Sequence, residues 1–218
     1  MALLGGRLLF VALMALTTAA CQDSGPQPRF ISNSDDGGTP VEASGAAARE
    51  VKTASVAKDN GYFIEFRSRY ALSYGHTYVV FGRSTKSGEM INPQVAGLHP
   101  ASESEVPYVM GHFVPVKAET GWSDGDLEEQ YRSASWRLMV TESEYNQIVA
   151  NIRKLQASSP VWHAALYNCN AFVADIARSI GFKTPAIQLR SQQFVTKLRE
   201  MNAGRKIVIH TPTISSAG

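Results

Sequence analysis

Two segments joined by a polar turn, the first of them rich in β-branched and aromatic residues, place the strongest constraint on how this chain folds. The first segment is His-Thr-Tyr-Val-Val-Phe-Gly at 76–82, and Thr-Lys-Ser-Gly at 85–88 supplies the turn. Residues 89–95 can then return beside the first segment as its antiparallel partner. An earlier segment, 62–70, alternates apolar and charged residues from Ile64 onward, which is typical of a strand with one buried face. The sequence therefore predicts an antiparallel sheet that begins with these three strands.

Periodic apolar residues predict three helices later in the chain. Thr141 and Glu144 have the spacing of a capping box and open the first helix. The second is predicted to begin after Asn168 and to end at Gly181, and the third covers about 191–201. The apolar residues expected on the inner faces are Tyr145, Ile148, Ile152 and Leu155 in the first helix, Phe172, Ile176 and Ile180 in the second, and Phe194, Val195 and Leu198 in the third.

Further strands are predicted at 108–116, 136–140 and 206–210. The summed pattern predicts an α+β fold, with a mainly antiparallel sheet and helices packed on it. A chain of 218 residues that is 44% hydrophobic can support one well-buried core. We expect that core in one domain, residues 59–218.

The first 21 residues have the order of a secretory signal. Arg7 precedes an apolar run at 8–16, and small residues follow it before Cys21. A cysteine directly after such residues resembles the lipobox of bacterial lipoproteins, which would make Cys21 the lipid-bearing first residue of the mature chain. Thr18 stands where that motif usually has leucine. Ordinary signal cleavage that leaves a plain thiol, and a helix of the fold, are the alternatives.

Residues 22–58 are rich in Gly, Ser, Ala, Pro, Asp and Thr, and Phe30 and Ile31 are almost their only large apolar side chains. Such a segment cannot bury enough apolar surface to offset the entropy of ordering it. We expect a flexible linker that tethers an exported domain to a membrane through the N-terminal lipid anchor.

The charge and the spacing of possible ligands exclude two classes of function. The formal net charge is only +2, and no run of five or more Lys or Arg occurs, so we expect no nucleic-acid partner. The two cysteines form no Cys-x-x-Cys, and the five histidines show no ligand spacing: His76, His99, His112, His163 and His210. We therefore expect no metal and no cofactor.

Cys169 is the candidate reactive residue. With Asn168 as N-cap it stands in the first turn of the predicted second helix, where unpaired backbone N–H groups and the helix dipole favour an anion. These groups lower a thiol pKa and favour the thiolate, which is the nucleophile. The alternative is a small buried residue at a helix start. A disulfide with Cys21 would tie a linker to a helix start and is not expected.

Cysteine catalysis also needs a histidine to exchange the proton and a third group to orient the imidazole. His76 begins a strand and is the predicted base. A turn centred near residue 85 would place His76 opposite Gln94, with Asn92 as a diagonal neighbour on the same face. Asn92 is the chosen third group and Gln94 its rival. Weaker alternatives are His99, expected in a loop that contains proline, together with His112 and His163.

Two motifs in this order resemble a known family. Gly-His-Thr-Tyr-Val-Val at 75–80 precedes Asn-Cys-Asn-Ala-Phe-Val at 168–173, so the histidine comes before the cysteine. The pattern resembles the circularly permuted papain fold, which includes permuted NlpC-type cysteine peptidases, lecithin:retinol acyltransferase-like proteins and the PPPDE group of thiol peptidases. The likeness covers about 62–185.

The resemblance implies Cys169 as nucleophile, His76 as general base and acid, and Asn92 in the variable third position. The backbone N–H of Cys169 would be one oxyanion donor, and Tyr74 and Asn168 are the side chains considered for the other. Members of the acyltransferase-like branch often carry a second histidine on the return strand, and residues 90–93 contain none.

We therefore expect an exported cysteine hydrolase that cleaves an amide or peptide bond through a thioester. Its location makes a cell-wall peptide the expected substrate. Two alternatives stay open: a non-catalytic envelope lipoprotein that uses the same fold for binding, and a thioester-mediated acyltransferase.

Overall fold

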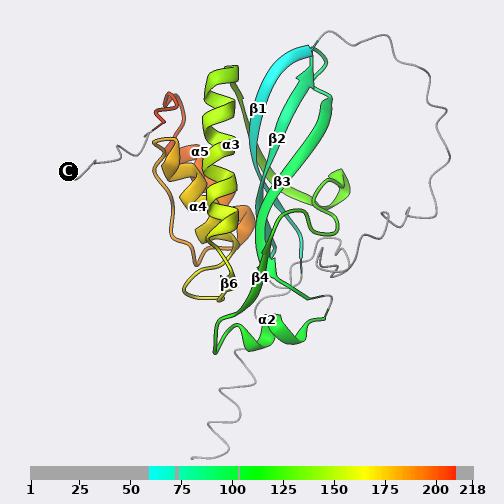
Figure 1. The fold of residues 1–218 in the computed structure, drawn as a ribbon, viewed down its shortest axis with the longest axis vertical. Helices are drawn as coiled ribbons and strands as arrows, with labels where there is room; N and C mark the ends of the chain where they lie inside the picture. Colours follow the sequence, from blue (N-terminus) through cyan, green and yellow to red (C-terminus); the bar gives the residue numbers. More distant parts are fainter. Residues whose placement is uncertain (1–58, 72–73, 103, 210–218) are drawn as a thin grey trace, which may run out of the picture.

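A six-stranded antiparallel sheet forms the centre of the molecule (Figure 1). The computed structural model describes residues 59–71, 74–102 and 104–209, so the predicted signal and linker lie outside the described residues. The strand order is β5-β1-β2-β3-β4-β6. The strands are β1 (Asp59–Arg69), β2 (His76–Thr85), β3 (Met90–Pro100), β4 (Val116–Thr120), β5 (Arg132–Val140) and β6 (Val161–Trp162).

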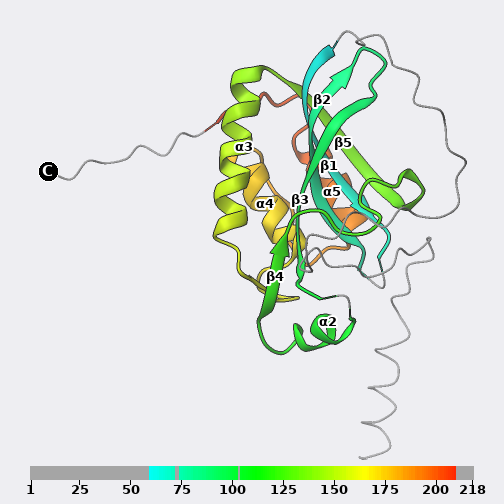
Figure 2. The same ribbon diagram turned by 45° about the vertical axis from the view of Figure 1, so that its right-hand side comes forward.

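Three helices cover one face of this sheet, and they are the three that the sequence predicts. They are α3 (Glu142–Ala157), α4 (Cys169–Ser179) and α5 (Ser191–Met201). Figures 1 and 2 show them on one side of the sheet, while the short helix α2 (Val106–Met110) lies at the lower end beside β4. The predicted capping box is present, since Thr141 accepts from the N–H of Glu144 and the Glu144 carboxylate accepts from the N–H of Thr141. The predicted α+β class is confirmed.

Successive side chains along each strand point to opposite faces of the sheet, and the buried ones form two clusters, one on each face. The helix side of the sheet contributes Ile64, Phe66, Val79, Phe81, Ala96 and Leu98 to the main core, where they meet Ile148, Ile152, Phe172, Ile176, Phe194 and Leu198 from the helices. The other side contributes a smaller cluster: Phe63, Tyr78, Val80 and Val95. Leu127 packs against this smaller cluster, and the Tyr78 hydroxyl donates to the backbone carbonyl of Asp126. The segment that carries these two residues therefore covers part of the second face.

The register of the β2–β3 hairpin differs from the one predicted. Ser84 pairs with Met90 and Tyr78 with Gly97. Two residues beyond that last pair, the same register brings His99 opposite His76. The expectation that Gln94 lies opposite His76 is wrong, because the turn is centred further along the chain and both strands are longer than expected.

Two predicted strands are also corrected. Residues 108–116 do not form one strand, because Pro107 stands in the first turn of α2 and β4 begins only at Val116. Proline fixes its φ in the helical range and cannot donate to a sheet ladder, so it favours the short helix. Residues 206–209 are irregular, although the N–H of Val208 donates to the carbonyl of Ile180, and His210 lies outside the described residues.

The buried amide of Asn170 joins α4 to its neighbours. Its Oδ1 accepts from the Thr77 hydroxyl of β2 at 2.6 Å. Its Nδ2 donates to the carbonyls of Ile187 and Leu189, at 3.0 and 2.7 Å, in the segment that leads into α5. These bonds hold the start of α4 against both β2 and the start of α5.

We predict that Asn170→Ala lowers the free energy of unfolding by roughly 3 kcal/mol or more, because it leaves several buried polar groups without partners. Urea unfolding followed by circular dichroism measures this loss. Asn151→Ala is a matched control, since Asn151 lies on the partly exposed face of α3. Equal stability of the two variants would contradict the structural role of Asn170.

Candidate active site

A cavity of about 410 Å³ lies at the end of the sheet where β2 begins and β3 ends. The first residues of α4 and α5, the helix α2 and the segment around Ser123 complete its wall. Among its lining residues are Cys169, His76, His99 and Ser191, together with the apolar side chains of Leu98, Tyr108, Val109, Trp162, Ile187 and Leu189. The predicted nucleophile and base therefore line one cavity.

Cys169 is the first residue of α4, as predicted. Asn168 is its N-cap, and Oδ1 of Asn168 accepts from the N–H of Ala171 at 3.0 Å. Nδ2 of Asn168 donates to the carbonyls of Ala164 and Ile187. The Asn168 amide is thus committed to the backbone, which argues against it as an oxyanion donor.

The environment of Cys169 raises the pKa of its thiol. Burial is the largest cause, although the cavity leaves the residue partly exposed. Hydrogen bonds from the backbone of Thr77, the hydroxyl of Ser191, and the backbone of Asn170 and Cys169 lower the pKa, but by less. The expectation of a lowered thiol pKa is therefore wrong. The hydrogen bonds at the helix start do lower the pKa of Cys169, but burial raises it by more.

His76 and His99 stand side by side on adjacent strands. They are 6% and 4% exposed, and their ring centroids lie 5.9 Å apart with the rings nearly perpendicular. Nδ1 of His99 lies 3.2 Å from the carbonyl oxygen of Pro100. Neither Nε2 has a hydrogen-bond partner among the residues that the structure describes. His99, expected in a loop, is thus the polar side chain of β3 that accompanies His76.

Gly97 leaves the space that the ring of His76 occupies. A Cβ at residue 97 would lie 2.8 Å from Nε2 of His76 and 3.1 Å from Cβ of Tyr78. Any larger residue would displace the imidazole. The same short distance shows that Nε2 of His76 is directed at β3.

Burial keeps both imidazoles neutral. It lowers the pKa of His76 well below 6.5, and the charges of Arg69 and His99 lower it further. It also lowers the pKa of His99, although the Pro100 carbonyl opposes the shift. Arg69 is itself paired with the buried carboxylate of Asp126, at 2.6 Å from Nε to Oδ1. Burial raises the pKa of Asp126, and Arg69 opposes that shift.

The other predicted residues take different places. Asn92 is exposed and has a φ of 45°, next to the register shift of the hairpin and away from the cavity. Gln94 is also exposed and accepts a hydrogen bond from Arg153 of α3. His112 lines the cavity, whereas Nδ1 of His163 accepts from the N–H of Ala165 within a turn. Neither Asn92 nor Gln94 can orient His76 here.

Ser191 is a site residue that the sequence did not indicate. It is the first residue of α5, its side chain is buried, and its N–H donates to the carbonyl of Tyr74 at 3.1 Å. A Cβ at Gly75, where φ is +75°, would lie 3.2 Å from Cβ of Ser191 and 2.8 Å from the carbonyl of Arg69. The glycine before His76 thus lets α5 approach β2 closely enough for Ser191 to reach Cys169.

Comparisons with protein-family models, with curated proteins and with solved structures found no match for this chain. Within the described ranges, no group of three or more His, Cys, Asp or Glu side chains could hold a metal ion. None of the helices in that part of the chain is long and apolar enough to cross a membrane.

We predict that Ser191→Ala slows alkylation of Cys169 about two- to ten-fold at pH 8, because the variant loses one hydrogen bond to the thiolate. Iodoacetamide labelling across a pH series, quantified at Cys169 by peptide mass spectrometry, measures the shift. Ser179→Ala is the control, since that hydroxyl donates to Ile176 within α4. A profile identical to the control would contradict the role of Ser191.

The histidine pair predicts a loss of stability in mild acid. The folded pKa values of His76 and His99 lie below 6.5, so the unfolded chain takes up protons first as the pH falls below that value. The free energy of unfolding should then fall by up to about 1.4 kcal/mol per pH unit for each histidine. Urea unfolding between pH 7.5 and pH 5 measures the slope, which should be smaller in the double variant His76→Gln, His99→Gln. An unchanged slope in the double variant would contradict the assignment of the pH dependence to this histidine pair.

Proposed function

We propose that this chain is a cysteine hydrolase with a circularly permuted papain-like fold, which cleaves an amide or peptide bond through a thioester. Cys169 is the nucleophile, His76 the general base and acid, and His99 the third group in place of Asn92. One observation carries the proposal: a single cavity is lined by a cysteine at a helix start and by two buried histidines.

The pKa shifts favour a resting state in which thiol and imidazole are both neutral. As Sγ of Cys169 attacks the carbonyl carbon, the thiol proton passes to His76. The backbone N–H of Cys169 can donate to the oxyanion that forms. His76 then gives the proton to the amine, the C–N bond breaks, and a thioester remains. Water completes the cycle: its oxygen bonds to the acyl carbon while His76 takes its proton, the C–S bond breaks, His76 returns the proton to Sγ, and a carboxylic acid leaves.

The topology is consistent with the proposal. His76 begins β2, which has β1 and β3 as neighbours within the sheet, and the cysteine helix α4 follows later in the chain and packs against the same sheet. Catalytic side chains at the ends of strands and the starts of helices are held rigidly in position. This order, histidine first and cysteine second, is the one that the resemblance implies.

Thioester-mediated acyl transfer is the second candidate, and two observations favour it. The return strand continues to Pro100 and carries His99, so the second histidine of the acyltransferase-like branch has a counterpart here. The cavity wall is also largely apolar and aromatic, as an acyl chain requires. The two reactions share the thioester and differ in the group that accepts the acyl unit.

The proposed location is the bacterial cell envelope. The signal-like segment before Cys21 supports export and lipid anchoring, and the polar segment 22–58 would be the tether. A cell-wall peptide is the proposed substrate on the ground of that location.

The test is whether Cys169 forms an acyl-enzyme with the help of His76. The full chain, mixed with p-nitrophenyl acetate, should release a burst of p-nitrophenol and gain one acetyl group on Cys169. His76→Ala should slow this acylation roughly 100-fold or more, and His99→Ala should slow it less, because His99 contacts the base only through the edge-on packing of the two rings. Because the pKa of His76 is lowered, the acylation rate of the wild-type chain should fall only well below pH 6.5.

Asn92→Ala is the control and should leave the burst unchanged. If Cys169 forms no acyl-enzyme, or forms it equally fast in His76→Ala, the enzyme proposal fails and a binding role for the cavity becomes the better explanation.

A further inference from the structure

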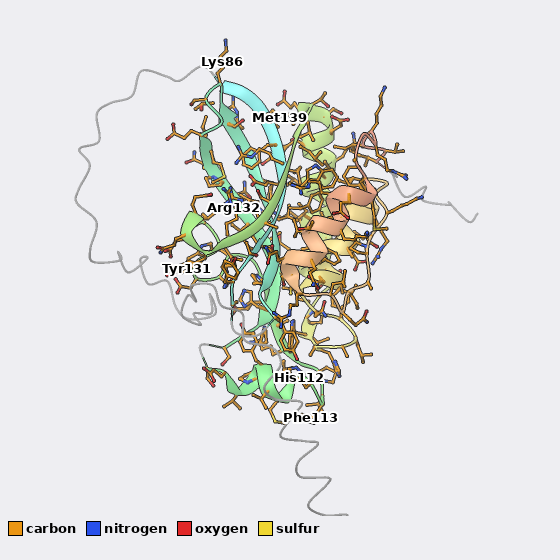
Figure 3. The ribbon with its side chains drawn as sticks, turned by 180° about the vertical axis from the view of Figure 1, so that it is seen from behind. Lys86, His112, Phe113, Tyr131, Arg132 and Met139 are labelled. Carbon is orange, nitrogen blue, oxygen red and sulfur yellow. The ribbon has the colours of Figure 1, made fainter. Side chains whose placement is uncertain are left out.

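The segment 106–114, comprising α2 and the turn after it, exposes large apolar side chains. Five of them are between 47% and 76% exposed: Val106, Val109, Met110, Phe113 and Val114. Glu105 is the one charged residue in 104–114. Figure 3 shows His112 and Phe113 at one end of the molecule and Lys86 and Met139 at the other. Side chains of this kind, gathered on one segment, are typical of an interaction surface.

This surface continues into the cavity that contains Cys169. Tyr108, Val109 and His112 belong to the segment and also line the cavity. Tyr74, which is half exposed, lies on the rim with its ring 5.9 Å from that of His112. Leu166 is 71% exposed and follows Ala165, another lining residue. Exposed apolar and aromatic side chains therefore lie at the opening of the cavity, together with the polar residues Glu105 and Gln188.

A second, shallow groove lies on the same segment. Its volume is about 310 Å³, and its lining consists of Ala101, Val106, Pro107, Met110, Val114, Val116 and Lys117. Six of these residues are apolar and the seventh is a cation. An acyl chain fits the apolar part, and the exposed ammonium of Lys117 can bind the phosphate of a lipid headgroup.

We infer that the α2 surface, defined as residues 106–114 with Tyr74, Leu166 and Lys117, docks on a phospholipid bilayer and turns the mouth of the cavity toward it. Apolar side chains with aromatic residues at their border and one lysine match the interfacial region of a membrane. The substrate is then a molecule presented at the lipid surface. This inference rests on the proposed function for the reaction and for the anchor.

The proposed tether is long enough for this orientation. It has 37 residues (58 − 22 + 1) and directly precedes Asp59, the first residue of β1. The 11 residues of β1 extend along the sheet for about 36 Å. A flexible chain of the tether's length has a root-mean-square span of roughly 30–37 Å and a fully extended reach of about 120 Å. The domain can therefore place α2 against the membrane that holds its N-terminus.

The experiment compares two added tryptophans in the full chain. Phe113→Trp places one on the α2 surface, and Met139→Trp places the other on β5, at a position that is also exposed. Vesicles of phosphatidylcholine with brominated acyl chains should quench the added fluorescence at 113 and leave that at 139 unchanged. Equal quenching at both positions, or none at 113 in vesicle-bound protein, overturns the inference.

Sedimentation with vesicles measures how strongly the chain binds them when a negative charge is introduced on the α2 surface. Phe113→Asp and Val106→Asp should each weaken vesicle binding roughly ten-fold or more, relative to Met139→Asp. Both aspartate variants should keep the p-nitrophenol burst in buffer without vesicles. If the aspartate variants keep both the burst and the vesicle binding, the docking inference is wrong and the proposed function stands. If the wild-type chain docks on vesicles but gives no burst, the proposed function is wrong and the docking stands. A dimer in solution that Phe113→Asp dissociates would mean that a second copy covers the surface, and would also overturn the inference.

Discussion

The placement of Cys169 depends on the buried side chain of Asn170, the next residue. Its amide accepts from Thr77 and donates to the carbonyls of Ile187 and Leu189, so it joins β2, α4 and the segment before α5. Such bonds contribute about 1 kcal/mol each when made, and cost more when one partner is lost in a buried place. The packing that they enforce brings the backbone of Thr77 and the hydroxyl of Ser191 to the sulfur, and it also removes the water that would otherwise stabilise a thiolate.

Burial therefore favours the neutral form of both members of the proposed dyad, Cys169 and His76. It raises the pKa of Cys169 and lowers that of His76, so an ion pair is disfavoured from both sides. Arg69 adds to this effect on His76, because its charge repels an imidazolium, while Asp126 compensates the charge of Arg69 itself. Proton transfer then has to accompany the attack on the substrate. A thiol in such a site reacts slowly with electrophiles in solution, because little of it is present as thiolate.

Local signals predicted β1, β2, β3 and β5 and the three long helices, whereas α2, β4 and β6 were missed. The capping box at Thr141 and the asparagine before Cys169 predicted two helix starts correctly, since both involve residues close in sequence. The residue opposite His76 was predicted wrongly, because an error in the position of the hairpin turn shifts the paired residue by twice that error. Tyr78 pairs with Gly97, which puts the centre between residues 87 and 88 and not at 85, and the partner moves from 94 to 99. Ser191 has no local signature, because its role depends on how closely α5 approaches Gly75.

The α2 surface and the choice between the two candidate reactions are physically connected. Hydrolysis needs water at the thioester on Cys169, whereas transfer needs a second nucleophile in its place. Exposed apolar and aromatic side chains form part of the rim of the cavity. In contact with a lipid surface such a rim would restrict the entry of water and admit amphiphiles, because water is costly to transfer across an apolar boundary and acyl chains are not. Docking would therefore favour acyl transfer at the membrane, and the undocked domain would favour hydrolysis with the same cysteine and histidine.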